Sequence, residues 1–230
     1  MKLGVVIAAA GAGKRMGSST KKQFLCLKDK PILLHTLEQF IGLESVQEIV
    51  IVTGAEDIEM TKDLVQSYPS VLVVPGGKER QDSVYAGLKS LRTSEYVLIH
   101  DGARPFVSQS AIQGLVNHLK VKQSAILAVP VKDTIKQVNN QGIVVNTPPR
   151  ESLWAVQTPQ AFHVPLIMKA YLHAEEQGFY GTDDASLVEF YGEEVSVVLG
   201  EYTNIKITTP EDLWTGEMIL QNKEGKGIHR

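Results

Sequence analysis

The first seventeen residues constrain this chain more than any other stretch. Val5, Val6 and Ile7 form an almost wholly apolar run, which is typical of a strand covered on both faces. The run breaks into the small residues 8–13 and is followed by Lys14 and Arg15. Small residues let backbone N–H groups approach a ligand closely, and two cations behind them indicate an anion. The stretch therefore predicts a phosphate-binding loop after a buried strand.

Two familiar phosphate loops do not match this stretch. A Walker loop needs Ser or Thr after its Gly-Lys, but Arg15 stands there. The dinucleotide fingerprint opens well at Gly11 and Gly13, yet Met16 occupies its last glycine position. No acid closes the second predicted strand either, since residues 52–54 read Val-Thr-Gly. A nucleotidyltransferase loop, Gly-x-Gly, then Lys or Arg, then Arg-Met, is filled at every position.

Composition excludes several classes of protein. The chain has 230 residues and a formal charge of −3, which argues against a nucleic-acid or membrane-surface binder. The single Cys26 excludes an intramolecular disulfide and favours a reducing cytoplasm. No apolar stretch is long enough to span a membrane. The start of the chain is similar to a signal peptide, but its core is short and β-branched and two cations follow it.

Apolar runs and helical patterns alternate along the chain. Runs at 49–52, 71–74, 96–99 and 125–129 predict further strands, and residues at helical spacing over 31–40, 84–91 and 112–119 predict helices between them. A late strand is expected over 204–208, before a last helix that begins at Pro210. This alternation predicts a single α/β domain over 1–230, with three Rossmann-like layers and a mostly parallel sheet.

One stretch interrupts the alternation. Two short β-prone segments, 134–138 and 143–146, flank the turn-rich residues 139–142 and predict an inserted β-hairpin. A lone two-stranded hairpin is marginal in water, so its apolar side chains need cover. A second subunit would provide that cover, which makes residues 132–152 a dimerisation arm. The alternative is a hairpin that folds back on its own domain.

Polar residues follow the third and fourth predicted strands at the same expected edge of the sheet. Residues 75–83 combine glycines with a helix start, which suits polar ligand groups, although Asp82 and Ser83 also fit as helix caps. Asp101 is well placed for magnesium. The alternative makes Asp101 a turn former paired with Arg104.

Two later positions are also candidates. Thr182 fits best as a helix cap before two acids. Lys206 lies in a buried-looking segment, and an anionic substrate would explain its charge better than solvent does. The six histidines show no metal-ligand spacing, so none is assigned to a metal.

Eight motifs together resemble one family over nearly the whole chain. They are AAAGAGKRMG, KKQF, GGKERQDSV, HDGARPF, PVKDT, TPPRESLWAVQTPQAF, TDDAS and NIKITTPEDL. The chain is similar to the 2-C-methyl-D-erythritol 4-phosphate cytidylyltransferases of the non-mevalonate isoprenoid pathway. The resemblance implies transfer of the cytidylyl group of CTP to methylerythritol phosphate, with release of pyrophosphate and with Mg²⁺ as cofactor.

The resemblance also implies roles for individual residues. Ala9, Ala10, Gly11, Ala12 and Gly13 would wrap the triphosphate and base edge, and Gly77 and Ser83 would contact cytosine and ribose. Arg15 and Lys22 would stabilise charge on the α-phosphate. Asp101, with Gly102 and Arg104 beside it, would lie by the metal and the substrate hydroxyls. Lys206 and Thr158 would bind the methylerythritol phosphate.

The arm carries two further implied site residues and there are two departures from the family pattern. Arg150 and Thr134 would reach the site of the other subunit of a homodimer. Arg150 is counted with the catalytic cations Arg15, Lys22 and Lys206. Lys21 replaces a usual proline and would share the role of Lys22. The residue after Gly77 varies in the family, so Lys78 is given no base contact.

Three rival functions remain open on the sequence. A ribitol-5-phosphate cytidylyltransferase would share the fold and the chemistry. A dinucleotide-dependent oxidoreductase is disfavoured by Met16 and by the missing ribose acid. A non-catalytic nucleotide-binding regulator would have no need of Lys22 and Lys206 together.

Overall fold

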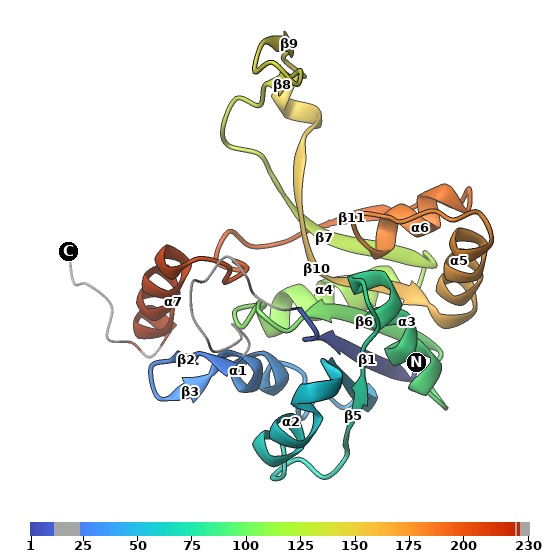
Figure 1. Ribbon diagram of the computed structural model, residues 1–230, viewed down its shortest axis with the longest axis vertical. Coiled ribbons are helices and arrows are strands. Elements are labelled where there is room, and N and C mark those ends of the chain that lie inside the picture. The colour runs from blue at the N-terminus through green and yellow to red at the C-terminus, as the bar shows by residue number, and fades with distance from the viewer. Residues whose placement is uncertain (12–23, 224, 226–230) are drawn as a thin grey trace.

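A seven-stranded sheet forms the centre of the molecule in the computed structural model, which describes residues 1–11, 24–223 and 225 (Figure 1). The strand order across the sheet is β11-β7-β10-β6-β1-β4-β5. These strands are β1 (Leu3–Ala8), β4 (Val46–Thr53), β5 (Val71–Pro75), β6 (Tyr96–Asp101), β7 (Ser124–Pro130), β10 (Trp154–His163) and β11 (Ser196–Leu199). β10 runs antiparallel to its neighbours β6 and β7, and the other paired strands are parallel. The predicted mostly parallel α/β sheet is confirmed.

Strand β1 lies in the interior of the sheet, as its apolar run predicts. It pairs in parallel with β4 on one side and with β6 on the other. Val5 and Ile7 belong to one buried apolar cluster, and Val6 between them belongs to a second cluster. Successive side chains of a strand point to opposite faces, so an uninterrupted apolar run supplies two cores at once.

Helices cover both faces of the sheet and complete three layers (Figure 1). Residues of α1, α2 and α4 pack into the cluster on one face, and residues of α3, α5 and α6 pack into the other cluster. The helices are α1 (Ile32–Glu38), α2 (Ile58–Leu64), α3 (Arg80–Ser90), α4 (Gln109–His118), α5 (Val164–Glu176), α6 (Asp184–Phe190) and α7 (Pro210–Lys223). A short 3₁₀ turn, Ala55–Asp57, precedes α2. None of the helices that the structure describes has the length and apolar character that crossing a bilayer requires.

A third, smaller apolar cluster attaches α7 to the body of the molecule. It joins Leu27, Ile32, Phe106 and Ile207, beside the two-residue strands β2 (Cys26–Leu27) and β3 (Lys30–Pro31). The helix approaches closely here, because a Cβ on Gly216 would lie 3.0 Å from Leu27 Cδ1. Helix α7 therefore anchors the segment that precedes it, residues 204–208.

The late strand predicted over Asn204–Thr208 is wrong. This segment joins no strand of the sheet, and Ile207 N–H donates to the carbonyl of Ala103 at 2.8 Å. The apolar side chains that suggested a strand pack on the α7 cluster instead of on the sheet. The strand that precedes this segment, β11, had no counterpart in the sequence prediction.

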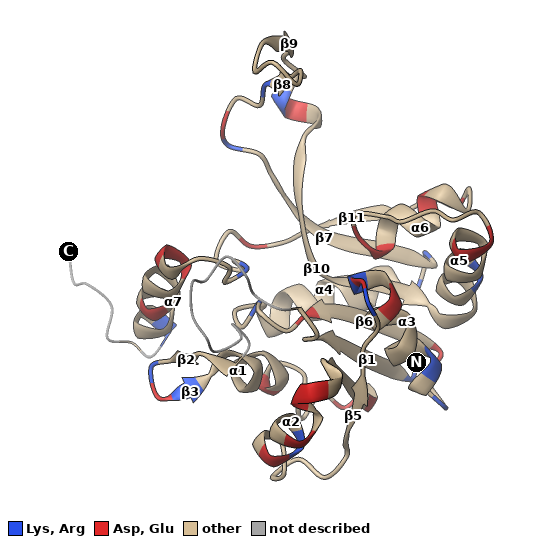
Figure 2. Cartoon of the chain, viewed as in Figure 1, with Lys and Arg blue, Asp and Glu red and all other residues tan. Residues whose placement is uncertain are grey.

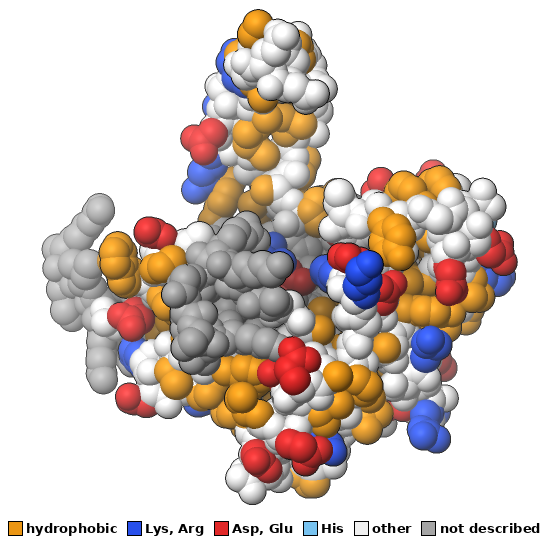
Figure 3. Space-filling view, viewed as in Figure 1, with side chains coloured by type: hydrophobic (Ala, Val, Ile, Leu, Met, Phe, Trp, Pro, Cys, Tyr) orange, Lys and Arg blue, Asp and Glu red, His pale blue; other side chains and the backbone are white. Residues whose placement is uncertain are grey.

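The predicted hairpin is present between β7 and β10 and projects from the body (Figure 1). Its strands β8 (Gln137–Val138) and β9 (Val144–Asn146) pair antiparallel, and a 3₁₀ turn, Arg150–Ser152, follows them. The side chains of Ile143 and Val145 are 58% and 56% exposed. Figure 3 shows apolar side chains along this arm. Its own domain does not cover them, so the alternative in which the hairpin folds back is not observed.

Candidate active site

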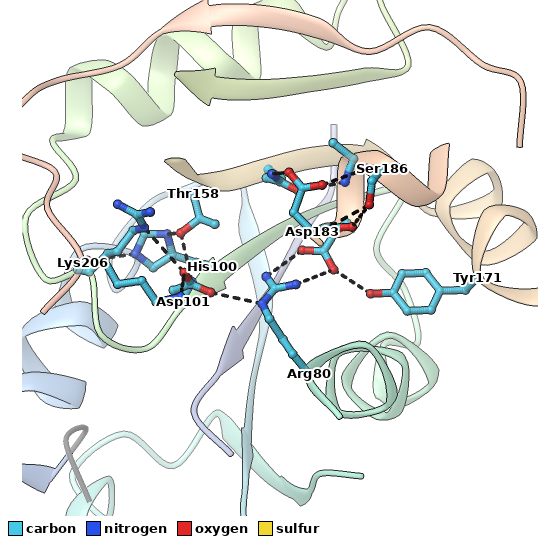
Figure 4. Close-up of polar contacts among 12 residues, drawn as sticks. Arg80, His100, Asp101, Thr158, Tyr171, Asp183, Ser186 and Lys206 are labelled. Carbon is cyan, nitrogen blue, oxygen red and sulfur yellow. Dashed lines mark hydrogen bonds and ion pairs between the residues drawn. The ribbon is translucent and has the colours of Figure 1, made fainter. Parts of the chain in front are cut away.

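Asp101 ends β6 at the centre of a cluster of three cations. The Nζ of Lys206 lies 2.7 Å from Asp101 Oδ2, and Arg104 Nε lies 3.6 Å from the same oxygen. Arg80 Nε donates to Oδ1 at 3.3 Å (Figure 4). Burial by itself would raise the pKa of Asp101, but these three cations outweigh it and hold that pKa well below its usual range. The carboxylate is therefore ionised at neutral pH.

Arg80 connects this cluster to a second buried carboxylate. Its NH1 and NH2 groups donate to the two oxygens of Asp184 at 3.1 and 2.8 Å, and Tyr171 donates to Asp184 Oδ1 at 2.6 Å (Figure 4). Asp184 is only 1% exposed. Burial alone would lower the pKa of Arg80, whereas the charges of Asp184 and Asp101 raise it. Arg80 is thus fixed as a cation between two carboxylates.

Arg80 is a site residue that the sequence did not predict. It opens α3, directly after the glycine turn. A cation is disfavoured at a helix N-terminus, where the helix dipole is positive. The position of Arg80 at a helix N-terminus was the sequence feature that could have identified it, because a cation placed against the helix dipole needs a nearby anion.

His100 and Thr158 form a hydrogen-bonded pair next to Asp101. The Thr158 Oγ1 accepts the backbone N–H of Asp101 at 3.0 Å and lies 3.0 Å from His100 Nδ1. His100 Nε2 lies 2.9 Å from the carbonyl of Arg104. Burial lowers the pKa of His100 to about 4, so its ring is neutral at neutral pH.

The first cavity, of about 330 Å³, lies at the carboxyl edge of β1 and β6. It brings together eight residues that the sequence predicted for the site. They are Ala9, Ala10, Gly11, Gly77, Ser83, Asp101, Gly102 and Lys206. The register of β1 on β6 places Ala8 opposite Asp101, which sets the small-residue loop beside the carboxylate. Parallel strands end at one edge, so residues far apart in sequence share this cavity.

Hydrogen bonds among neighbouring residues hold the turn that carries Gly77 in place. Ser83 Oγ accepts the N–H of Gly77 at 3.1 Å and donates to the carbonyl of Glu79 at 3.0 Å. Asp82 accepts the N–H of Glu79 at 3.0 Å and so caps α3 from its first turn. A Cβ on Gly77 would lie 2.4 Å from that of Asp82, which leaves room only for glycine. The N-cap of α3 is Glu79, so the cap predicted at Asp82 or Ser83 lies three or four residues earlier; Asp82 completes the capping box from the first turn, and Ser83 is oriented toward the glycine turn.

A second cavity, of about 310 Å³, shares Arg80, Asp101 and Lys206 with the first. Its other polar lining residues are Arg104, Gln157, Thr158, Gln160, Thr182 and Asp183. The helix cap predicted at Thr182 is wrong by one residue. Asp183 is the cap of α6, because its Oδ1 accepts the N–H of Ser186 at 2.9 Å. A cation-lined cavity next to a small-residue loop can bind two anions side by side, one at the loop and one among the cations.

The remaining predicted residues lie elsewhere. Arg150 is exposed on the arm, where its NH1 donates to the carbonyl of Lys132 at 3.0 Å, and Thr134 lies on the same arm. Neither residue lines either of these two cavities. Figure 2 shows Lys and Arg positions on the arm, apart from those in the body near β6. Ala12, Gly13, Arg15, Lys21 and Lys22 lie outside the described residues.

Asp101 does not fit the direct magnesium ligand that the sequence predicted. Both of its oxygens are already ion-paired, and a cation bound to them would face Arg80, Arg104 and Lys206. Within the part of the chain that the structure describes, no three His, Cys, Asp or Glu side chains come together as a metal site. The described residues therefore suit anions better than a protein-bound metal.

Fold and site together define a class of protein. A mostly parallel sheet with a small-residue loop at its carboxyl edge and a cation cluster beside it is typical of nucleotide-binding α/β enzymes.

The comparisons with known proteins narrow this class. The model of the family described as 2-C-methyl-D-erythritol 4-phosphate cytidylyltransferase matches residues 3–222. A protein of that name from Halalkalibacterium halodurans is 51% identical over 227 residues, covering 97% of this chain and 99% of its own. The chain belongs to this family of cytidylyltransferases.

Solved structures agree with the fold. The 4-diphosphocytidyl-2C-methyl-D-erythritol synthase of Anaerococcus prevotii superposes with a TM-score of 0.85 at 36% identity, covering 96% of each chain. The 2-C-methyl-D-erythritol 4-phosphate cytidylyltransferase of Thermus thermophilus has a TM-score of 0.81 at 32% identity, covering 96% of this chain and all of its own.

Proposed function

We propose that the protein transfers the cytidylyl group of CTP to 2-C-methyl-D-erythritol 4-phosphate, giving 4-diphosphocytidyl-2-C-methyl-D-erythritol and pyrophosphate. The observation that carries the proposal is that two cavities meet at Arg80, Asp101 and Lys206. A transfer between two phosphate compounds needs two anion sites that open onto one reacting centre. Membership of the family supplies the identity of the two substrates.

The first cavity would bind CTP. Its small residues, Ala9 to Gly11, allow backbone N–H groups to approach phosphate oxygens. Arg15 and Lys22, as the family resemblance implies, would stabilise the α-phosphate. Lys21 would share the role of Lys22. Gly77 would lie against the base and ribose, while Ser83 fixes the turn around it.

The second cavity would bind the polyol phosphate. Lys206, Arg104 and Arg80 line it and would attract the phosphate, and Asp101 would accept hydrogen bonds from hydroxyl groups. Asp101 also keeps the three cations in one place. Arg104 is well suited to this role because its guanidinium presents several donors to one anion.

The reaction needs cations and no catalytic base. An oxygen of the methylerythritol phosphate attacks the α-phosphorus of CTP, a new P–O bond forms, and the bond to the β-phosphate breaks to release pyrophosphate. The nucleophile is already an anion, so the protein positions the two phosphates and stabilises the added charge. Magnesium, the cofactor that we propose, would neutralise charge on the triphosphate.

We also propose a homodimer and a cytoplasmic location. The exposed apolar arm would pack on a second copy of the chain, and Arg150 and Thr134 would then reach the partner's second cavity. The free Cys26 fits a reducing compartment.

The test is pyrophosphate release from the purified protein with CTP and magnesium, comparing methylerythritol 4-phosphate with ribitol 5-phosphate. Release with the first alone is the expected result. Release with the second alone would assign the protein to ribitol 5-phosphate and refute the proposal. Arg15→Ala and Lys22→Ala should each lower turnover by two or more orders of magnitude, as lost charge stabilisation does. Near-normal turnover in either variant would contradict its role.

A further inference from the structure

The buried histidine beside Asp101 makes two directed hydrogen bonds. His100 is fully buried, packs edge-on against Phe40 and has both ring nitrogens within bonding distance of a partner. A carbonyl oxygen can only accept, so Nε2 must donate its proton to the carbonyl of Arg104. In a neutral imidazole the other nitrogen, Nδ1, is then an acceptor.

This arrangement fixes the hydroxyl of Thr158. Its oxygen accepts the N–H of Asp101, and its proton must be donated to His100 Nδ1. A hydroxyl has one proton and two lone pairs. Thr158 therefore has one lone pair left, and no proton, for a ligand in the second cavity that it lines.

We propose that His100 is a positioning residue that presents Thr158 to the second cavity purely as a hydrogen-bond acceptor. Thr158 then accepts a hydroxyl of the polyol and makes no bond to its phosphate, because an unprotonated phosphate oxygen offers no proton. The cations Lys206, Arg104 and Arg80 remain for the phosphate. The proposal rests on the function proposed above, and it reverses the phosphate contact that the family resemblance implied for Thr158.

The tautomer can be measured without any activity. Nitrogen-15 NMR of the imidazole in the full chain should show a protonated Nε2 and an unprotonated Nδ1. A protonated Nδ1 would overturn the proposal. This measurement holds whether or not the protein uses methylerythritol phosphate, so failure of the proposed function is separable from failure of this inference.

A matched pair of variants tests the positioning. In His100→Asn the amide oxygen takes the place of Nδ1 and still accepts from Thr158. In His100→Gln the amide nitrogen takes the place of Nε2, but no acceptor faces Thr158. We expect His100→Gln to raise the KM for methylerythritol phosphate about tenfold, the effect of one hydrogen bond, and His100→Asn to stay near the wild type. The KM for CTP should not change. Equal losses in both variants, or a raised KM for CTP, would indicate a merely structural role.

The substrate side is tested by calorimetry with methylerythritol phosphate analogues that each lack one hydroxyl. One analogue should bind the wild type and Thr158→Ser about tenfold more weakly than the parent compound, and should lose this difference in Thr158→Val. Inorganic phosphate should bind all three proteins alike. Weaker binding of inorganic phosphate to Thr158→Val would overturn the proposal, as would equal discrimination by Thr158→Ser and Thr158→Val.

Discussion

At the scale of single residues, the site depends on paired charges that are far apart in the sequence. Arg80 and Asp184 are 104 residues apart and form a two-pronged ion pair. A buried ion pair adds little net stability, but removing one partner leaves an uncompensated charge. The pair therefore serves to hold Arg80 at the boundary between the two cavities.

Arg80→Met should destabilise the protein by about 4 kcal/mol, because it leaves the almost fully buried carboxylate of Asp184 without a cation. Tyr171→Phe is the matched control. It removes one hydrogen bond to the same carboxylate and should cost about 2 kcal/mol. Urea unfolding of both variants measures the difference. Equal losses would show that Arg80 contributes no more than an ordinary hydrogen bond.

At the scale of elements, α7 and the segment before it behave as one unit. Asp212 accepts the N–H groups of Thr208 and Thr209, both at 2.8 Å, and the hydroxyl of Thr208 at 2.9 Å. This cap connects the helix to the chain that carries Lys206 two residues earlier. The position of the lysine thus depends on a helix cap as well as on Asp101.

Asp212→Asn keeps an acceptor oxygen but removes its charge, and it should destabilise the protein at pH 7 by about 1 kcal/mol, because a neutral amide oxygen accepts these hydrogen bonds less strongly than a carboxylate does. Burial would raise the pKa of Asp212, but the hydrogen bonds from Thr208 and Thr209 outweigh it and lower that pKa. A lowered pKa adds stability above the pKa of the unfolded chain, near 3.9, and this stability disappears as the pH falls further.

The difference between wild type and Asp212→Asn in urea unfolding should therefore shrink from pH 7 to pH 3. Glu211→Gln removes the same charge one residue earlier, outside the cap, and serves as the control. It should change stability by less than about 0.5 kcal/mol at both pH values. A difference for Asp212→Asn that grows toward pH 3 would contradict the sign of the pKa shift.

At the scale of the whole molecule, the arm exposes apolar side chains that the rest of its own chain does not cover. A two-stranded hairpin with exposed apolar side chains is unstable alone in water. A second copy of the chain would bury these side chains and would bring Arg150 to the partner's site.

Ile143→Glu combined with Val145→Glu should convert a dimer to a folded monomer, because charges resist burial in an apolar interface. Sedimentation velocity measures this. Val121→Glu changes a 79% exposed apolar residue after α4 and should leave the dimer intact. A double variant that sediments like the wild type would argue against the arm as the interface.

Sharing of sites across the dimer has its own test. Arg150→Ala should weaken the use of methylerythritol phosphate and leave CTP binding nearly intact, whereas Lys206→Ala removes a cation of the body. A mixture of the two variant proteins should recover some pyrophosphate release, because half of the sites in a mixed dimer contain both residues. No recovery above the separate variants would argue against shared sites.

The sequence alone determined the interior strands, the small-residue loop and the hairpin. Residues 5–7, 49–52 and 96–99 were predicted as strands, because uninterrupted apolar runs between turn residues are typical of strands covered on both faces. The site residues of the glycine turn and of Asp101 followed from the rule that parallel strands end at one edge. The charge of Lys206 in a buried-looking segment indicated an anionic substrate. The resemblance to a family then added Thr158 and Arg150, which periodicity could not connect to a site.

Only the tertiary structure decided which distant segments meet. It inserted β10 antiparallel between β6 and β7, paired β11 at the edge, and kept residues 204–208 out of the sheet. It also brought Arg80 to Asp184 and Lys206 to Asp101. Local patterns report how each segment is buried, but a contact across a hundred residues depends on the order in which the strands pack. That order arises from the whole set of competing long-range pairings and is not contained in any single stretch of the chain.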